Sequence, residues 1–167
     1  MTLTVAKRSR RLGARRSPPT RVPAQTNALA GARYIESSAL VAALLERHAD
    51  ARNAIRKRGR RVTSALTLAE TARAIVRARA AGRLTAEQER ACVRALRRFE
   101  RRCYVAAVTD AVLARVRAPF PIEPIRTLDA VHLATAELLG EPPLLMTIVS
   151  RDVRVRENAE ALGYAVE

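Results

Sequence analysis

Aromatic residues are scarce in this chain of 167 residues. They make up 3% of it, and tryptophan is absent. Proteins that bind single-stranded nucleic acid by stacking its bases need several aromatic rings on one surface. The composition therefore argues against that class of binding protein.

Cysteine, histidine and long apolar runs are also scarce. Cys92 and Cys103 are the only thiols, their spacing is not CxxC, and two histidines are too few to complete a zinc site with them. No run approaches the ~20 apolar residues of a membrane span, and the N-terminus lacks the apolar segment of a secretory signal. We therefore predict reduced thiols, a cytoplasmic location and no membrane partner.

Positive charge, by contrast, is abundant. The chain has 31 Lys and Arg against 16 Asp and Glu, a net charge of +15. Residues 1–33 hold eight basic residues and no acidic one, which leaves 23 basic and 16 acidic residues, a net +7, in the remainder. A basic surface attracts polyanions by releasing their counterions, so this charge favours a nucleic-acid partner.

The first 31 residues differ from the rest. They contain the stretches SPPT and RVP and show no apolar periodicity. We predict a disordered basic extension over residues 1–31 and one domain over residues 32–167. Two alternatives remain for the extension: an upstream start codon, or an arginine-rich mitochondrial transit peptide.

Beyond residue 32, short apolar runs alternate with helical patterns. Strands are predicted over residues 33–36, 61–64, 103–108, 144–150 and, as an edge strand, 164–167. Helices are predicted over residues 37–59 (one or two helices), 65–82, 85–102, 109–118, 127–140 and 151–163. This alternation predicts the α/β class, with a central, mainly parallel sheet flanked by helices on both sides.

Four acidic residues fall where predicted strands end or helices begin: Glu36, Glu70, Asp129 and Asp152. In open parallel sheets, the carboxyl ends of the strands share one edge, and binding sites form there. The four carboxylates are therefore candidates for a common site.

Each carboxylate also has a plainer explanation. Two fit helix N-caps, in the pairs Thr127 with Asp129 and Ser150 with Asp152. Glu70 stands three residues before Arg73, so the two could form an ion pair on the surface of a helix. Glu36 could be an ordinary carboxylate in the loop after its strand.

Together, however, the four carboxylates indicate a metal. Clustered carboxylates repel one another unless a cation lies among them. Ligands that are all oxygen suit Mg²⁺ or Mn²⁺ rather than zinc. Carboxylate-held metal ions on a basic protein are typical of enzymes that cleave phosphodiesters.

Four stretches carry a resemblance to a known family: YIESSALVAALLE, TSALTLAETARAI, IRTLDAVHLATAELLG and TIVSRDVRVRENAEALGY. In this order they resemble the motifs of PIN-domain ribonucleases, especially the VapC-type toxins of toxin–antitoxin pairs, over residues 33–167. The third stretch is the most specific match.

The resemblance implies a three-layer PIN-like fold and a metal-dependent endoribonuclease that uses Mg²⁺ or Mn²⁺ to cleave RNA. It also implies a small VapB-like antitoxin as partner, and a homodimer. The family's catalytic acids fall on Glu36, Glu70, Asp129 and Asp152. Of these, Glu36, Asp129 and Asp152 are the expected metal ligands, and Ser38 and Ser150 match the family's supporting hydroxyls.

The chain departs from the family pattern at two positions. Glu36 replaces the family's Asp, and Ala42 stands where many relatives have Lys or Arg. Because Mg²⁺ tolerates geometric error poorly, a catalytically weakened PIN-fold binding module is the alternative to an active nuclease. A phosphoacceptor domain would need a lysine near the site. The only lysines, Lys7 and Lys57, lie in basic stretches away from the motifs, which argues against that class.

Basic residues beside these motifs are candidates for phosphate contacts. Arg126 flanks the third motif, and Arg60 and Arg61 belong to a basic run over residues 52–61. That run also fits a solvated helix end. His132 lies one helical turn after Asp129, and we assign it to helix packing rather than to a metal.

Overall fold

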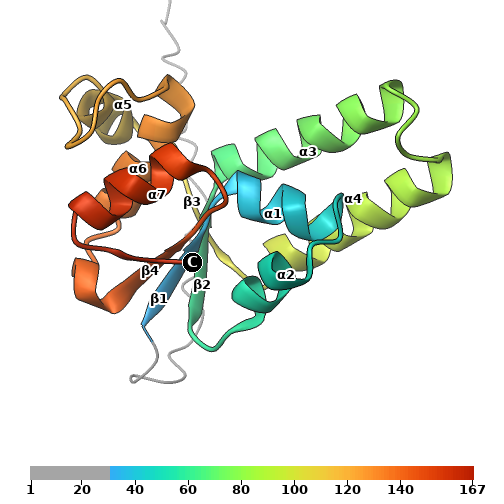
Figure 1. Cartoon of the computed structure of the whole chain (residues 1–167), viewed down its shortest axis with the longest axis horizontal. Helices are drawn as coiled ribbons and strands as arrows, with labels where there is room; N and C mark the ends of the chain where they lie inside the picture. Colours follow the sequence, from blue (N-terminus) through green and yellow to red (C-terminus); the bar gives the residue numbers. More distant parts are fainter. Residues whose placement is uncertain (1–30) are drawn as a thin grey trace, which may run out of the picture.

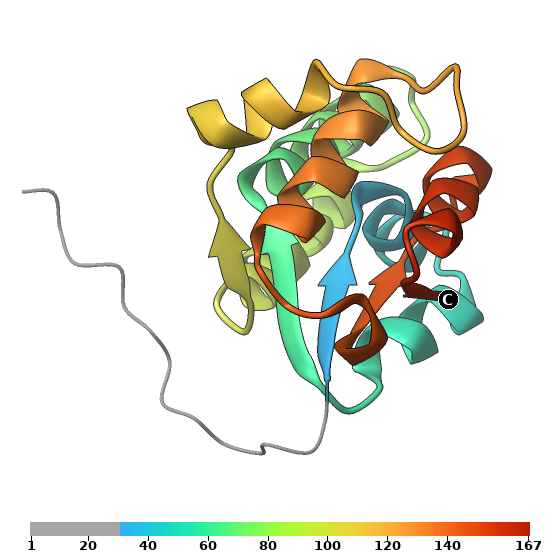
Figure 2. The same ribbon diagram turned by 90° about the vertical axis from the view of Figure 1, so that its left-hand side faces the viewer.

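The central element of the fold is a five-stranded sheet in which every pairing is parallel. The computed structural model describes residues 31–167, so residues 1–30 of the predicted extension lie outside the described part. The strands, in the spatial order β3-β2-β1-β4-β5, are β1 (Ala32–Ile35), β2 (Arg60–Ser64), β3 (Tyr104–Ala106), β4 (Met146–Val149) and β5 (Ala165–Val166). Figure 2 shows β1 between β2 and β4, with their arrowheads pointing the same way.

Helices cover both faces of this sheet (Figure 1). On one side lie α1 (Ser37–Leu44), α2 (Ala49–Arg56), α3 (Ala65–Ala80) and α4 (Ala86–Glu100). On the other side lie α5 (Asp110–Val116), α6 (Thr127–Leu138), α7 (Val153–Ala161) and the 3₁₀ helix η1 (Pro143–Leu145). The prediction of a three-layer α/β domain is therefore confirmed.

Neighbouring residues of β1 belong to different packing clusters, as the two-residue period of a strand requires. Tyr34 belongs to the cluster that includes Leu133 of α6. Ile35 packs with Ala39 of α1 and Val149 of β4 in a second cluster. The sheet is thus buried on both faces, which explains why Met146, Ile148 and Val149 of β4 are all apolar and buried.

Three boundaries differ from the sequence prediction. Pro143 to Leu145 form η1 rather than the start of a strand, because Pro142 and Pro143 have no N–H to donate to a sheet. β3 covers three residues of the six predicted, and β1 ends at Ile35, so Glu36 is the N-cap of α1. The capping box predicted at the start of α4 is confirmed.

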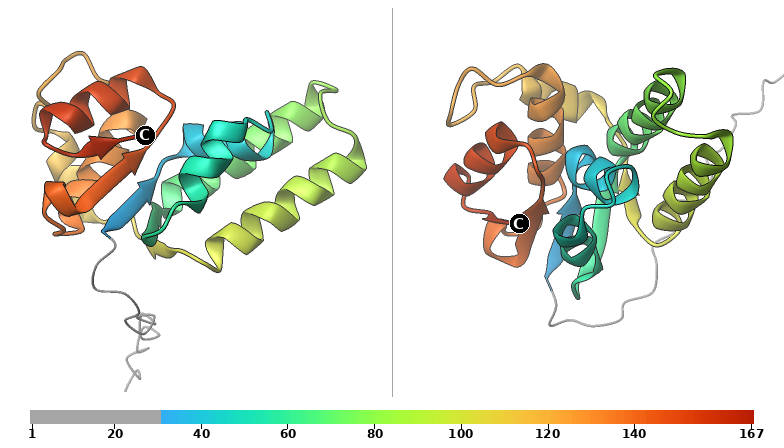
Figure 3. Two further views of the ribbon diagram at one scale, coloured as in Figure 1. Left: turned by 60° about the horizontal axis from the view of Figure 1, so that its bottom comes forward. Right: turned by 45° about the vertical axis from the view of Figure 1, so that its right-hand side comes forward.

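The strand order places a topological switch beside β1. The chain runs from β1 to β2 on one side of it, and β4 later pairs with its other side. A crevice opens at the carboxyl ends of the strands at such a point. α3 and α4 form a hairpin that extends away from the sheet (Figure 3). Within residues 31–167, no helix is long and apolar enough to cross a membrane.

Candidate metal centre at the carboxyl edge of the sheet

Glu36 lies at the switch point and is 3% exposed. Its backbone N–H donates to the carbonyl of Val149, which joins the ends of β1 and β4. Its carboxylate caps α1 by accepting a hydrogen bond from the Ser38 N–H at 3.0 Å. The hydroxyls of Ser37 and Ser150 donate to the same carboxylate at 2.6 and 2.9 Å, and the Ser38 hydroxyl also donates to it. Glu36 is therefore a carboxylate held in place from three sides.

Ser38 and Ser150, the two predicted supporting hydroxyls, also hold Asp152. The Asp152 N–H donates to both hydroxyls at 3.1 Å, and the Arg151 N–H donates to Ser38 at 2.8 Å. Asp152 is itself the N-cap of α7, since its Oδ1 accepts from the N–H groups of the next turn. The structure thus places the cap at Asp152, where the sequence suggested Ser150.

Glu70, on the second turn of α3, reaches a histidine of the opposite layer. Its Oε2 lies 2.7 Å from Nε2 of His132, which also lies 3.5 Å from Oε1 of Glu36. Burial opposes the charge of Glu70. The hydrogen bond and charge of His132, with contributions from Ser37 and Arg77, outweigh burial and hold the pKa of Glu70 below its usual value. Glu70 therefore pairs with His132, and not with Arg73 as the surface explanation required.

The carboxylate of Asp129 is repelled by other carboxylates close to it. Burial raises its pKa, and the negative charges of Asp152 and Glu36 raise it further, against the opposing charges of Arg126 and His132. Its Oδ2 is buried without a hydrogen-bond partner. Thr127 is not the N-cap, because the N-cap of α6 is Arg126, but Asp129 does lie in the first turn of α6, where an acid favours the helix dipole.

These side chains fit a divalent cation. One ligand atom each from Glu36, Glu70 and His132 lies within 4.8 Å of the other two. The unpartnered oxygen of Asp129 supplies a further donor beside them. The sequence predicted Glu36, Asp129 and Asp152 as ligands; the cluster joins Glu36 to Glu70 and His132, and the charges of Asp152 and Glu36 act on Asp129 beside it. The carboxylate oxygens suit Mg²⁺ or Mn²⁺, and His132 Nε2, 2.7 Å from Glu70 Oε2, is placed to orient one of these carboxylates rather than to hold the cation.

The predicted basic contacts lie at different ends of the sheet. Arg126 stands at the site, where its charge acts on Asp129. Arg60 and Arg61 begin β2, at the end remote from the carboxylates. Arg60 pairs with Glu141, and Arg61 donates to a backbone carbonyl. Lys57 pairs with Glu167 at 3.0 Å rather than with a site carboxylate.

Sequence reasoning missed the connecting role of His132. The assignment to helix packing is correct in that His132 is 1% exposed, but its ring also joins Glu70 to the core. Its Nδ1 lies 3.1 Å from the hydroxyl of Tyr34, a residue that the sequence did not single out. The available signals were the one-turn spacing from Asp129 and the two-residue spacing from Tyr34 to Glu36.

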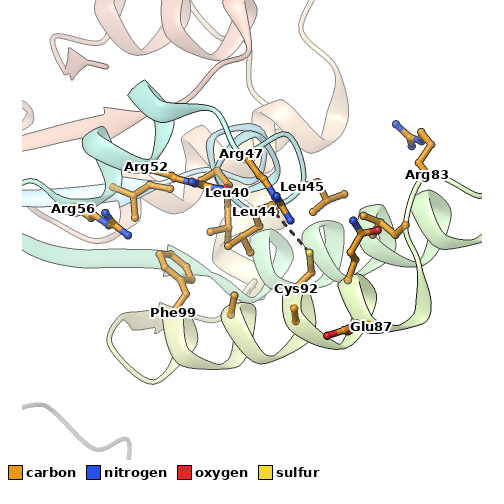
Figure 4. Close-up of a pocket in the computed structure, with 16 residues that line it drawn as sticks. Leu40, Leu44, Leu45, Arg47, Arg52, Arg56, Arg83, Glu87, Cys92 and Phe99 are labelled. Carbon is orange, nitrogen blue, oxygen red and sulfur yellow. Dashed lines mark hydrogen bonds between the residues drawn. The ribbon is translucent and has the colours of Figure 1, made fainter.

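A separate groove of about 570 Å³ lies between α1, α2 and α4 (Figure 4). Its apolar lining includes Leu40, Leu44 and Phe99. Four arginines also line it: Arg47, Arg52, Arg56 and Arg83. The Cys92 thiol, which donates to the Leu44 carbonyl, lies in this groove. The groove is thus apolar and positively charged, and distinct from the carboxylate site.

Parallel α/β domains that gather carboxylates at one sheet edge are suited to metal-dependent chemistry. The sequence model of one such family, the PIN domain, matches residues 33–161. The chain therefore belongs to the PIN domain family, as the four sequence motifs indicated.

Curated relatives support this assignment. The chain is 39% identical over 137 residues to ribonuclease VapC35 of Mycobacterium tuberculosis, which covers 80% of this chain and 93% of the relative. It is 40% identical over 139 residues to ribonuclease VapC46 of the same organism, covering 80% and 94%.

Solved structures share the fold. VapC20 of Mycobacterium tuberculosis, described as a toxin that cleaves the sarcin–ricin loop, matches 80% of this chain and 96% of its own, with a TM-score of 0.57 and 18% identity. The VapBC2 complex of Rickettsia felis, bound to promoter DNA, matches 81% and 97%, with a TM-score of 0.57 and 13% identity.

Proposed function

We propose that this protein is a metal-dependent endoribonuclease, the toxin of a VapC-type toxin–antitoxin pair. One observation carries the proposal: motifs spread over more than 110 residues of a PIN-family chain converge on one buried carboxylate site. The relatives at 39–40% identity are ribonucleases by name, which supports RNA as the substrate.

Within this proposal, Glu36, Asp129 and Asp152 would hold Mg²⁺ or Mn²⁺, and Glu70, whose carboxylate lies beside that of Glu36, would complete the catalytic set as a further oxygen ligand. When bound, the cation polarises the scissile phosphate and lowers the pKa of a water. Ser38 and Ser150 fix the Glu36 carboxylate by their hydrogen bonds.

Basic residues are proposed to bind the RNA backbone. Arg126 stands beside Asp129 and is the first candidate for a phosphate contact. Arg60 and Arg61 would reach only RNA that continues to the far end of the sheet.

The test is RNA cleavage by the purified protein in Mn²⁺ or Mg²⁺, in EDTA, and by the Asp129→Ala variant. The proposal expects cleavage only by the wild type with metal. Cleavage that survives EDTA or Asp129→Ala would overturn the metal–carboxylate mechanism.

The second candidate function is a catalytically weak binding module, and the surroundings of Glu36 favour it. Three hydroxyls and one backbone N–H already bind this carboxylate, which has one methylene more than the family's Asp. An inactive wild type combined with an active Glu36→Asp variant would support this second function. An active wild type that Glu36→Asp does not improve would exclude it.

The proposed partner is a small VapB-like antitoxin, and the groove between α1, α2 and α4 is its proposed docking site. An amphipathic segment with acidic flanks would place its apolar side on Leu40 and Phe99 and its carboxylates on the arginine rim. We expect Arg47→Glu combined with Arg52→Glu to abolish co-purification with the protein encoded by the adjacent reading frame. We also propose a homodimer, which sedimentation analysis would test.

A further inference from the structure

Tyr34 and His132 form a buried polar pair behind the carboxylates. Their side chains are 0% and 1% exposed, and the Tyr34 hydroxyl lies 3.1 Å from His132 Nδ1. The rings meet edge to face at an interplanar angle of 67°. Buried polar atoms are costly unless they are hydrogen-bonded, and here the chain of bonds continues from Tyr34 through His132 to Glu70.

The acceptors determine the direction of these bonds. Nε2 of His132 faces carboxylate oxygens of both Glu70 and Glu36, and a carboxylate oxygen accepts, so Nε2 carries the hydrogen that it directs at Glu70 Oε2. In a neutral imidazole, Nδ1 is then the acceptor, and the Tyr34 hydroxyl donates to it.

The pair connects the elements that carry three of the four acids. Tyr34 lies in β1, two residues before Glu36, and His132 lies in α6, one turn after Asp129. Glu70 comes from α3, on the other side of the sheet, and its side chain remains 25% exposed. A long, partly exposed glutamate has several rotamers, and the bond from His132 selects one of them.

We propose that Tyr34 and His132 are positioning residues that hold Glu70 against Glu36 and so set the metal affinity of the site. The inference rests on the proposed metal-dependent function. Outer hydrogen-bond partners of metal ligands typically change metal affinity by roughly 10–100-fold.

The first test needs no metal. Because the chain has only two histidines, a nitrogen-15 NMR spectrum of histidine-labelled protein contains two ring systems, and a His48→Asn variant assigns them. We expect His132 to be the Nε2–H tautomer in the wild type. We expect Tyr34→Phe to change its Nδ1 signal and to leave His48 unaffected. An Nδ1–H tautomer, or a spectrum that Tyr34→Phe leaves unchanged, would overturn the inference.

The second test is Mn²⁺ affinity, measured by electron paramagnetic resonance. We expect Tyr34→Phe to weaken binding by about 10-fold. Tyr164→Phe, which removes the hydroxyl of another buried tyrosine, should stay within about twofold of wild type. His132→Gln keeps a donor near the Nε2 position and should bind more tightly than His132→Leu. Thermal unfolding in EDTA verifies that each variant is folded.

The outcomes separate this inference from the proposed function. If the wild type binds Mn²⁺ and neither Tyr34→Phe nor His132→Gln changes its Mn²⁺ affinity, the positioning role alone is overturned. A wild type that binds no Mn²⁺ would overturn the proposed function, and the positioning role with it. In cleavage assays, Tyr34→Phe should lower kcat with little change in the KM for RNA.

Discussion

At the scale of single residues, the site depends on how Glu36 is held. The substitution of the family's Asp by Glu moves a carboxylate by one methylene, and Ser37, Ser38 and Ser150 fix the longer side chain. The N-terminal cap of α1 and the candidate metal site therefore use the same carboxylate.

Ser38 should matter more than its neighbour Ser37. The Ser38 hydroxyl donates to Glu36 and accepts from two backbone N–H groups at the start of α7. Ser38→Ala removes the partner of the Arg151 N–H, one of the two partners of the Asp152 N–H and one donor to Glu36, and we expect a loss of about 1–2 kcal/mol in the free energy of unfolding. Ser37→Ala removes one bond to Glu36 and is the matched control. Equal losses in urea denaturation would contradict this account.

Asp129 should destabilise the metal-free protein. Its pKa is raised in the folded state, so the folded protein binds its proton more tightly than the unfolded chain does. Stability from this group is therefore present below the ordinary aspartate pKa and is lost as the pH rises through the folded value. We expect Asp129→Asn to raise the Tm at pH 7 in EDTA, and the gain to disappear under acidic conditions. A lower Tm for Asp129→Asn at pH 7 would contradict the charge repulsion.

At the scale of elements, a buried arginine joins β1, α2 and the residue that follows β5. Arg33 is 6% exposed, donates to the Ala54 carbonyl at 2.8 Å, and pairs with Glu167 at 2.7 Å. Burial opposes the charge of Glu167, but the hydrogen bonds from Arg33 and Lys57 outweigh it and lower the pKa of Glu167.

Glu167→Gln should therefore destabilise the fold. It leaves the Arg33 charge buried without its counter-ion, and we expect a loss of about 2 kcal/mol, because Glu167 is itself only partly buried. The stabilisation exists above the ordinary glutamate pKa and is lost as the pH falls through the lowered one. The difference from wild type should thus shrink in acid. Glu141→Gln, which breaks the more exposed pair with Arg60, is the control and should cost less than about 1 kcal/mol.

The sequence predicted where the strands and helices lie along the chain better than it predicted which of them pack together. Alternating apolar runs and capping residues are local signals, so the strands and helices were found within a few residues, and proline explains the main error at η1. The strand order depends on which strands pair across long crossovers, and no local signal encodes it. The bond between Tyr34 and His132, 98 residues apart, was missed for the same reason.

At the scale of the whole molecule, positive charge is distributed between the domain and the extension. Residues 1–31 contribute seven of the 31 basic residues and none of the acidic ones. The net charge of the domain already favours RNA, so the extension should add affinity that is independent of sequence.

Deletion of residues 1–31 should therefore weaken RNA binding and reduce its salt dependence. On single-stranded RNA, the slope of log K against log salt should fall by about 0.7 for each phosphate that the protein no longer neutralises. Cleavage at saturating RNA should be unchanged. A protein with a scrambled extension of the same composition is the control, and it should bind like wild type. An unchanged slope after deletion would contradict an electrostatic role.

RNA cleavage by this protein is proposed to depend on the metal ion that its carboxylates bind. Titrating Mn²⁺ into one preparation, with binding and cleavage rate measured side by side, tests it most directly. We predict that both curves have the same midpoint and that Asp129→Ala abolishes both. Cleavage that is already complete before Mn²⁺ binds, or that persists in EDTA, would contradict the claim.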